Sequence, residues 1–217
     1  MKTNWVERLW IDGPWRTPFQ IRELNIFKRY HDLRGASRVL EIGCGRGVGA
    51  LLILKHFNPA HVEAVDIDPS MIRRAERRIT PEIEGRIIFR VDDAQDLSFP
   101  TQSMDAVFNF GIIHHLEDWE RGIREVSRVL VPGGFFYFEE IYPALYAGPV
   151  FRHILLHPKE NRFDGTQFRA ALARAGLSII DGYRESKYTI LGAAIRTDDG
   201  ATEERPIAAA RRVQTGR

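Results

Sequence analysis

Short apolar runs alternate with amphipathic stretches along most of the chain. Runs rich in Val, Ile and Phe predict five buried strands: 38–43, 61–68, 86–92, 104–111 and 135–142. Apolar residues recur at helical spacing in three segments between them: 48–57, 69–79 and 119–130. Because the strands are apolar almost throughout and alternate with helices, we expect a doubly wound α/β fold around a mostly parallel sheet.

The pattern changes at both ends of this alternation. Before the first strand, segment 19–33 has the apolar spacing of a helix. After residue 142 the strand–helix alternation stops, and a further helix is predicted over 164–176. Runs 177–186 and 188–197 leave no room for a helix between them, so we expect them to form an antiparallel hairpin.

We predict one main domain, residues 36–197, with segments of different character around it. Residues 1–35 are rich in aromatic side chains and are expected to form an N-terminal cap segment. Segment 142–163 is interrupted by prolines and is expected to be a cap insertion within the domain. The tail 198–217 is polar, rich in Arg and without periodicity, which favours disorder.

Composition restricts the class of protein further. The chain has 217 residues, of which 44% are hydrophobic and 28% charged, as is ordinary for soluble domains. The net charge of +2 does not by itself imply a polyanionic partner. Cys44 is the only cysteine, which excludes an intramolecular disulfide and a cysteine-rich metal site. No apolar run approaches the ~20 residues of a membrane span, so we expect a cytoplasmic protein without a metal, and peripheral membrane contact stays open.

Glycines alternate with other residues directly after the first predicted strand. They are Gly43, Gly45, Gly47 and Gly49 in the stretch "EIGCGRGVG". A glycine-rich turn between a strand and a helix lets a ligand approach the backbone closely. The dinucleotide fingerprint can be fitted to Gly45, Gly47 and Ala50, with Asp66 following, but a lone match of this kind is weak. Gly49 is expected to lie in the helix and to be dispensable.

An acid before the glycines favours a different ligand. Glu41, Gly43, Gly45 and Gly47 fit the pattern E/D-x-G-x-G-x-G, and with it the chain resembles class I S-adenosylmethionine-dependent methyltransferases. Four later segments are similar to further motifs of that family, in the same order: "VEAVDID", "VDDAQDLSFP", "MDAVFNFGIIHHL" and "EVSRVLVPGGFFYF". The resemblance covers residues 38–140. It implies a seven-stranded Rossmann-like sheet with an antiparallel C-terminal strand, and S-adenosylmethionine as cofactor.

The resemblance also implies which residues meet this cofactor. Glu41 would organise the glycine turn or meet the ammonium of the methionine end. Asp66 would accept hydrogen bonds from two ribose hydroxyls, and Ile67 would lie against the adenine. Asp93 would accept from the adenine amino group beside the backbone N–H of Ala94. The cofactor-binding set is Glu41, Gly43, Gly45, Gly47, Asp66, Ile67, Asp93, Ala94 and Asn109.

Methyl transfer from a sulfonium is an in-line displacement whose rate comes largely from positioning the acceptor and excluding water. A general base is needed only if the acceptor still carries a proton. His114 and His115 follow the fourth strand, and we expect their side chains to point in different directions. One of Glu139 and Glu140 is expected to point into the helix layer. His114 is the first catalytic candidate and Glu140 the second; that both histidines only pack the next helix stays open.

The two segments that build the acceptor pocket in this family are aromatic or apolar here. The first contains Trp5, Trp10 and Trp15, and the second is 142–163. We therefore expect a small apolar or aromatic acceptor: a quinone precursor, a lipid head group or a secondary metabolite. One alternative is an RNA or protein methyltransferase, suggested only by the tail and an arginine cluster on one helix. Another is a non-catalytic S-adenosylmethionine-binding partner subunit. The oligomeric state stays open.

Overall fold

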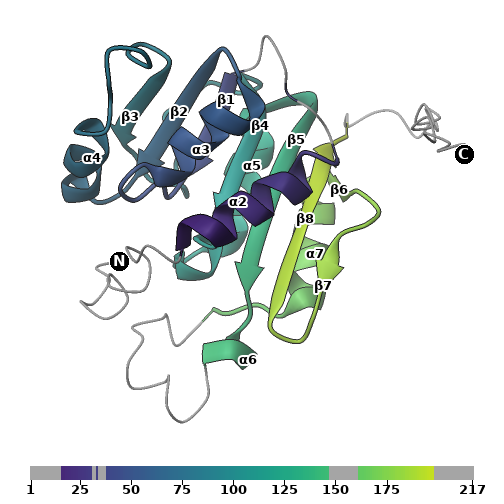
Figure 1. The fold of residues 1–217 in the computed structure, drawn as a ribbon. Helices are drawn as coiled ribbons and strands as arrows, with labels where there is room; N and C mark the ends of the chain where they lie inside the picture. Colours follow the sequence, from purple (N-terminus) through teal and green to yellow (C-terminus); the bar gives the residue numbers. More distant parts are fainter. Residues whose placement is uncertain (1–15, 31–32, 34–37, 147–160, 198–217) are drawn as a thin grey trace, which may run out of the picture.

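A sheet of eight strands runs through the middle of the protein, with helices on both faces (Figure 1). A computed structural model describes residues 16–30, 33, 38–146 and 161–197. The strands are β1 (Arg38–Ile42), β2 (His61–Asp66), β3 (Ile87–Val91), β4 (Met104–Phe110), β5 (Leu130–Ile141), β6 (Leu177–Ile179), β7 (Arg184–Glu185) and β8 (Thr189–Arg196). Their order is β3-β2-β1-β4-β5-β8-β6, with β7 also beside β8.

The first five strands pair in parallel, and the last strands reverse. Strand β1 is parallel to both β2 and β4, and β4 is parallel to β5. Strand β8 runs antiparallel to β5, and β6 and β7 pair with β8 on its other side. The doubly wound sheet with a reversed C-terminal strand is thus confirmed. The expected hairpin is present too, but its first arm is interrupted between Ile179 and Arg184, which produces an eighth strand.

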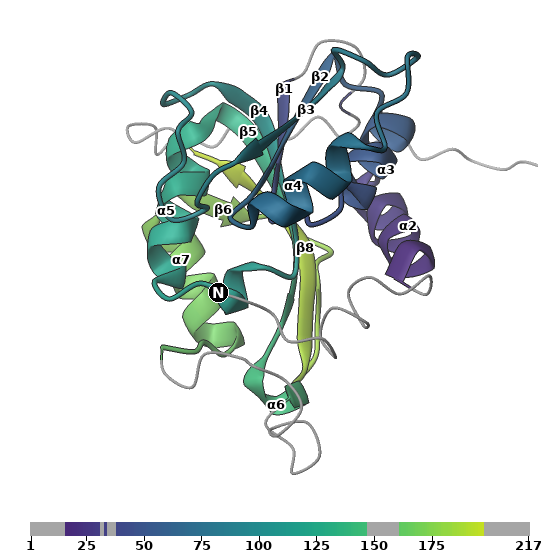
Figure 2. The same ribbon diagram turned by 90° about the vertical axis from the view of Figure 1, so that its left-hand side faces the viewer.

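Helices cover the two faces of this sheet in two separate groups (Figure 2). One face carries α2 (Arg16–Phe27), α3 (Val48–Phe57) and α4 (Pro69–Glu76); the other carries α5 (Trp119–Val129) and α7 (Gly165–Arg174). Two short helices, η1 (Ile113–His115) and α6 (Pro143–Tyr146), follow β4 and β5. Each face has its own hydrophobic core. Because side chains alternate along a strand, Phe136 and Phe138 enter the core under α5, and Tyr137 enters the core under α2 and α3.

Capping residues set where several helices begin. Asp68 accepts a hydrogen bond from Ser70 N at the start of α4, and Asp118 accepts from Arg121 N at the start of α5. Asp164 begins α7 with a reciprocal capping box. At the other end of α3, Asn58 has a left-handed backbone and closes the helix. These residues fix how each helix leaves the edge of the sheet.

Most predicted elements differ slightly in their bounds from the structure, and two differ most. The N-terminal helix, expected over 19–33, spans 16–27, because the next turn has tight bonds such as Tyr30 N to Phe27 O. Strand β5, expected over 135–142, starts at Leu130, which pairs with Met104. The ladder shifts register between these residues and Phe135, so the Pro-Gly-Gly stretch lies inside the strand as an irregularity instead of preceding it.

Part of the predicted N-terminal segment belongs to the main core. Helix α2 packs on α3 and β8, and its Leu24 and Phe27 are fully buried. Trp5, Trp10 and Trp15, most of the insertion 142–163, and the tail 198–217 lie outside the described residues. In the part of the chain that is described, none of the helices has the length and apolar character needed to cross a membrane.

Candidate active site

The glycine turn after β1 is held against the end of β2 by backbone hydrogen bonds. Cys44 N donates to Val65 O at 2.8 Å, and Gly45 N donates to the Asp66 carboxylate at 2.8 Å. A Cβ atom added at Gly45 would meet nothing within 4 Å, although the residue has a left-handed φ of 53°. The backbone at Gly45 therefore faces open space, where a ligand can approach it.

Gly49 supports this turn through close contact with a buried acid. It is the second residue of α3, as expected, but the side chain of Glu41 fills the space beside it. A Cβ atom at position 49 would lie 1.9 Å from Glu41 Oε1. A side chain at position 49 would require the buried Glu41 carboxylate to move, so whether Gly49 is dispensable stays a prediction. The spacing of the glycines gave no sign of this contact, because it depends on the direction in which the Glu41 side chain leaves β1.

Glu41 is 2% exposed and incompletely satisfied. Its carboxylate accepts the backbone N–H of Ala50, but Oε2 has no hydrogen-bond partner within the described residues. Burial, and then the nearby charge of Asp66, raise the pKa of Glu41 to about 8, and Arg16 opposes this. An unpaired buried acceptor costs stability. Glu41 thus organises the turn and also offers one oxygen to a cationic hydrogen-bond donor.

Asp66 stands at the end of β2 with both carboxylate oxygens engaged. Oδ1 accepts Asp68 N at 2.9 Å and Oδ2 accepts Gly45 N at 2.8 Å. Burial raises its pKa in spite of these bonds. A carboxylate has about four acceptor positions, so two remain for hydroxyl groups of a ligand. The neighbouring Ile67 is 52% exposed and can contact an apolar ligand surface.

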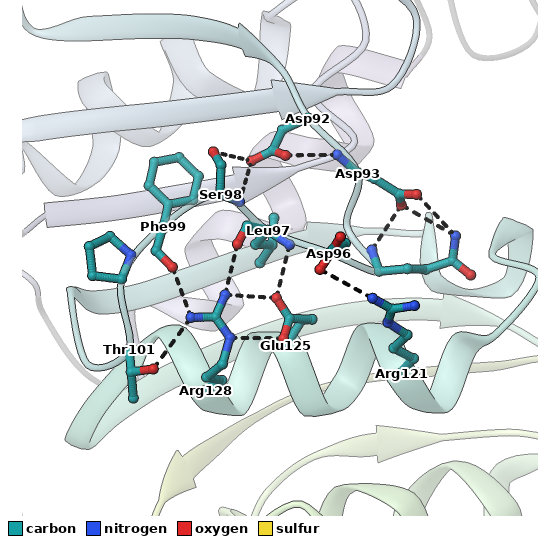
Figure 3. Close-up of polar contacts among 12 residues, drawn as sticks. Asp92, Asp93, Asp96, Leu97, Ser98, Phe99, Thr101, Arg121, Glu125 and Arg128 are labelled. Carbon is teal, nitrogen blue, oxygen red and sulfur yellow. Dashed lines mark hydrogen bonds and ion pairs between the residues drawn. The ribbon is translucent and has the colours of Figure 1, made fainter.

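The loop after β3 is held by its own carboxylates (Figure 3). Asp93 accepts from Gln95 N at 2.9 Å. Asp92 accepts from Ser98 N at 3.0 Å and Ser98 Oγ at 2.9 Å. Asp92 therefore stabilises the loop. Ala94 is buried between this loop and the core under α5.

Side chains of helix α5 anchor the same loop. Arg128 donates to Leu97 O and Phe99 O, each at 2.8 Å, and pairs with Glu125 at 2.7 Å. Glu125 in turn accepts Leu97 N at 2.9 Å. Figure 3 shows this pair of side chains reaching from α5 into the loop. The position of Asp93 is therefore fixed by two side chains of helix α5 as well as by hydrogen bonds within the loop itself.

A buried polar network fixes the loop after β4. Glu140 of β5 has no exposed surface, and its Oε1 accepts Asn109 Nδ2 at 2.7 Å and Ile113 N at 2.8 Å. Its Oε2 lies 2.6 Å from Nδ1 of His114. Asn109 is also fully buried, and its Oδ1 accepts Ile112 N at 3.0 Å. The network therefore determines both the path of the loop and the orientation of the His114 ring.

Burial favours the neutral form of both members of this pair. It lowers the pKa of His114 to about 3, with Arg16 acting in the same direction. It raises the pKa of Glu140 to about 7, against the hydrogen bonds from Asn109 and Ile113. The imidazole is therefore neutral at pH 7. A proton on Nδ1, facing the Glu140 carboxylate, makes Nε2 the basic nitrogen of the ring.

The two adjacent histidines do not point in clearly different directions, which corrects one expectation. Their rings lie 4.1 Å apart at an interplanar angle of 38°. Both follow β4 within η1, whose tight turns bring successive side chains closer than an extended chain would. The two glutamates do differ as expected: Glu140 is buried in the network, and Glu139 is partly exposed beside Arg16.

Sequence reasoning missed Arg16 and Glu23, which α2 brings to the ends of β4 and β5. Arg16 donates to Phe110 O at 3.2 Å and lies 3.4 Å from both Glu23 and Glu139. Burial, and then Glu139, raise the pKa of Glu23 to about 7, and Arg16 opposes this. Oε2 of Glu23 has no hydrogen-bond partner in the described part of the protein. No motif marks either residue, so only the packing of α2 reveals them.

The predicted cofactor residues fall into two groups. Glu41, Gly43, Gly45, Gly47, Asp66 and Ile67 meet where β1 and β2 end, and Asp93 and Ala94 follow the adjacent β3. Asn109, by contrast, is enclosed beside Glu140 and His114. Its direct contact with a cofactor stays a prediction. The described residues hold no group of three or more His, Cys, Asp or Glu side chains arranged to bind a metal ion.

Comparison with known proteins points in one direction. Residues 40–138 match the family model described as a methyltransferase domain. The chain is 34% identical to a fatty-acid O-methyltransferase of Mycolicibacterium smegmatis, over 69% of this chain and 46% of that protein. It is 33% identical to a probable phthiotriol/phenolphthiotriol dimycocerosates methyltransferase of Mycobacterium ulcerans, over 74% and 53%. The chain thus spans about half the length of these curated relatives.

The fold agrees with this match. The structure of a SAM-dependent methyltransferase from Aquifex aeolicus superposes with a TM-score of 0.68. The alignment covers 88% of this chain and 97% of that one at 18% sequence identity. At that identity the likeness concerns the fold, and the family match rests on the sequence of residues 40–138.

Proposed function

The chain belongs to the class I S-adenosylmethionine-dependent methyltransferase family, and on that premise we propose that it methylates a hydroxyl group of a small apolar molecule. The observation that carries this proposal is the His114–Glu140 pair, with 2.6 Å between Nδ1 and Oε2, beside the cofactor-binding edge of the sheet. The names of two relatives, which refer to a fatty acid and to phthiotriol dimycocerosates, support an apolar acceptor.

The residues at the ends of β1 and β2 fit S-adenosylmethionine. The unpaired, buried Oε2 of Glu41 is suited to an ammonium group, and the remaining acceptor positions of Asp66 are suited to ribose hydroxyls. The open side of Gly45 allows close approach to the backbone. When bound, S-adenosylmethionine supplies a methyl group activated by the positive sulfonium. We assign adenine recognition to Asp93, Ala94 and Ile67.

His114 is proposed to accept the proton of the acceptor hydroxyl. Burial keeps its imidazole neutral at pH 7, and its proton faces Glu140, so Nε2 is the basic nitrogen. A low pKa makes an isolated imidazole a weak base. Because the pKa of Glu140 is about 7, part of it is ionised at pH 7, and this carboxylate stabilises the imidazolium as the proton arrives.

Glu140 and Asn109 are proposed as positioning residues. Neither has exposed surface, and both accept hydrogen bonds from the backbone of the loop: Asn109 from Ile112 N, and Glu140 from Ile113 N. They therefore act through His114 and the loop, and not by touching the acceptor. This changes the assignment of Glu140 from a second catalytic candidate to the residue that orients the first.

A labelled-methyl assay tests the proposed function. The purified chain is incubated with labelled S-adenosylmethionine and a cell extract, which is then separated into lipid, small-molecule, RNA and protein pools. We expect the label in the lipid or small-molecule pool. Label confined to RNA or protein would overturn the proposed acceptor class. Donor binding without transfer to any pool would instead favour a non-catalytic partner subunit.

A set of variants tests the residue roles. His114→Gln should lower kcat by roughly 10²–10⁴-fold for a hydroxyl acceptor and leave the Kd for S-adenosylmethionine unchanged in calorimetry. His115→Gln is the matched control, because the two rings are neighbours. Asp66→Ala should abolish donor binding itself. Full turnover in His114→Gln would remove this residue as the base.

A further inference from the structure

The side chain of Gln95 bridges two loops at the carboxyl edge of the sheet. Its Oε1 accepts Asp118 N at 2.7 Å, and its Nε2 lies 3.3 Å and 3.5 Å from the two carboxylate oxygens of Asp93. Asp93 belongs to the loop after β3, whereas Asp118 caps α5 at the end of the loop that carries His114. One side chain therefore contacts both the proposed adenine-binding acid and the end of the proposed catalytic loop.

The chemistry of this bridge suits an amide. A backbone N–H only donates hydrogen bonds, so Asp118 N needs an acceptor, whereas a carboxylate only accepts, so Asp93 needs a donor. The amide of Gln95 presents its oxygen to the first and its nitrogen to the second. An acidic, basic or apolar side chain of similar length would serve one of these neighbours at most.

The loop between β4 and α5 is held at its two ends by different parts of the chain. At its start, the buried carboxylate of Glu140 accepts Ile113 N at 2.8 Å. At its end, Gln95 accepts Asp118 N. The first attachment belongs to the core of the sheet. The second comes from the loop that carries Asp93, so a ligand bound to Asp93 can act on it.

A second contact joins the same two segments at the surface. Asp96 and Arg121 form an ion pair at 3.1 Å (Figure 3). Their side chains are 78% and 51% exposed, so solvent weakens the pair. Gln95 is less exposed, and its amide contacts the Asp93 carboxylate itself. The amide bridge is therefore the better route from the donor loop to α5.

We propose that Gln95 is a positioning residue that transmits donor binding to the loop of His114. The inference rests on the proposed function, in which Asp93 receives the adenine amino group. Adenine then fixes the Asp93 carboxylate, the carboxylate holds the Gln95 amide, and the amide oxygen holds the start of α5. A bound donor thereby orders residues 113–118 and prepares the acceptor side for its ligand.

Hydrogen exchange of the full chain with S-adenosylmethionine tests the proposal. In the parent, saturating donor should slow the exchange of backbone amides in residues 92–98 and also in residues 113–118. One hydrogen bond is worth roughly fivefold in an equilibrium, so we expect about fivefold slowing at 113–118. Protection of 92–98 without a change at 113–118 would overturn the proposal. Absence of donor binding in calorimetry would contradict the proposed function, and this inference with it.

Two substitutions separate transmission from a merely structural role. Gln95→Glu keeps an acceptor for Asp118 N but removes the donor to Asp93, and Gln95→Leu removes both. Without donor, residues 113–118 should exchange at the parental rate in Gln95→Glu and roughly fivefold faster in Gln95→Leu. With saturating donor, neither variant should show the slowing at 113–118. Slowing of parental size in either variant would overturn the role of Gln95.

Ser98→Ala is the matched control within the same loop. It removes a hydrogen bond between two residues of that loop, from Ser98 Oγ to Asp92 at 2.9 Å. Asp96→Asn is a second control, because it weakens the exposed ion pair with Arg121. Both controls should keep the donor-dependent slowing at 113–118. Its loss in Ser98→Ala would show that any weakening of the loop has this effect, and would overturn the proposal. Thermal unfolding checks that all variants fold.

Discussion

The two halves of the carboxyl edge of the sheet are built in different ways. In the half that we propose binds the donor (the donor half), at the ends of β1, β2 and β3, backbone groups shape the site: Gly45 N binds Asp66 and Gln95 N binds Asp93. In the half that we propose faces the acceptor (the acceptor half), at the ends of β4 and β5, buried side chains do so: His114 meets Glu140, and Arg16 meets Glu139. The structure of the donor half depends on glycines at particular positions. The structure of the acceptor half depends on every member of a buried polar network.

This difference has a physical consequence for substitution. A turn shaped by the backbone tolerates changes in side chains that face solvent, but an added Cβ can collide with its surroundings. A buried polar network tolerates little loss, because removing one partner leaves others buried without a hydrogen bond. The two halves should therefore respond oppositely to enlarging and to deleting side chains.

The largest effect is expected from Glu140→Leu. It removes the acceptor of Asn109, Ile113 and His114, so we expect a loss of roughly 3–5 kcal/mol in the free energy of unfolding. Urea denaturation measures this loss. Glu140→Gln keeps the shape and one carbonyl oxygen and should lose less. Equal stabilities for Glu140→Leu and the parent would show that the network does not support the acceptor half.

Gly49→Ala tests the donor half by adding one carbon atom, whereas Glu140→Leu tests the acceptor half by removing a hydrogen-bond acceptor. The new Cβ would meet Glu41 at 1.9 Å, so the free energy of unfolding should fall by about 1–3 kcal/mol and donor affinity with it. Gly133→Ala is the control, because no atom lies within 4 Å of its added Cβ and only backbone strain is introduced.

A double-mutant cycle sharpens this result. Glu41→Ala removes the atoms with which the new Cβ collides, so Gly49→Ala should cost less stability in that background than in the parent. Donor affinity should stay low in the double variant, because Glu41 is gone. Additive losses of stability would mean that the two residues do not interact.

Arg16→Met is expected to change how stability depends on pH. The folded pKa of Glu23, about 7, lies above its usual 4.5, so the contribution of Glu23 to stability is fully present below about pH 4.5 and is lost as the pH rises through 7. Arg16 opposes this rise in pKa, so its loss should extend the decline to higher pH. Relative to the parent, the free energy of unfolding of Arg16→Met should be nearly unchanged at pH 5 and lower by about 1 kcal/mol at pH 8. Arg22→Met, an exposed change on the same helix, should show no such dependence.

The smallest expected effect is proton release when S-adenosylmethionine binds. Glu41, with a pKa of about 8, is mostly protonated at pH 7. A bound ammonium would lower that pKa, so binding should release up to about one proton. Calorimetry in two buffers with different ionisation enthalpies measures this release. Glu41→Gln should abolish it, and proton uptake by the parent would contradict the assignment of Glu41.

Local patterns were enough to predict where the residues of the donor half stand relative to the strands. Glu41, the glycines, Asp66 and Asp93 each stand at the end of a strand or in the turn that follows it. The parallel sheet then brings these ends together, because successive strands lie side by side in the order β3-β2-β1. What the pattern could not give was the direction of side chains, and so the contact of Gly49 with Glu41 was missed.

The acceptor half depended on contacts between distant parts of the chain. His114 and Glu140 were identified as candidates, but not as partners, since 26 residues separate them. Arg16 and Glu139 are 123 residues apart and belong to no motif. Their meeting follows from the packing of α2 on α3 and β8, which buries Leu24 and Phe27.

Local sequence patterns were sufficient for the order of the main strands and helices and for the positions of the glycine turn and its neighbouring acids, because periodicity and turn chemistry act over a few residues. Which polar groups are buried together, such as Asn109, His114 and Glu140, depends on how distant segments pack. The same packing brings Arg46 of the glycine turn and Arg74 of α4 to one groove. Burial and proximity shift pKa values and determine which polar groups form hydrogen bonds with each other. Burial and proximity themselves arise only once the helices have packed on the sheet.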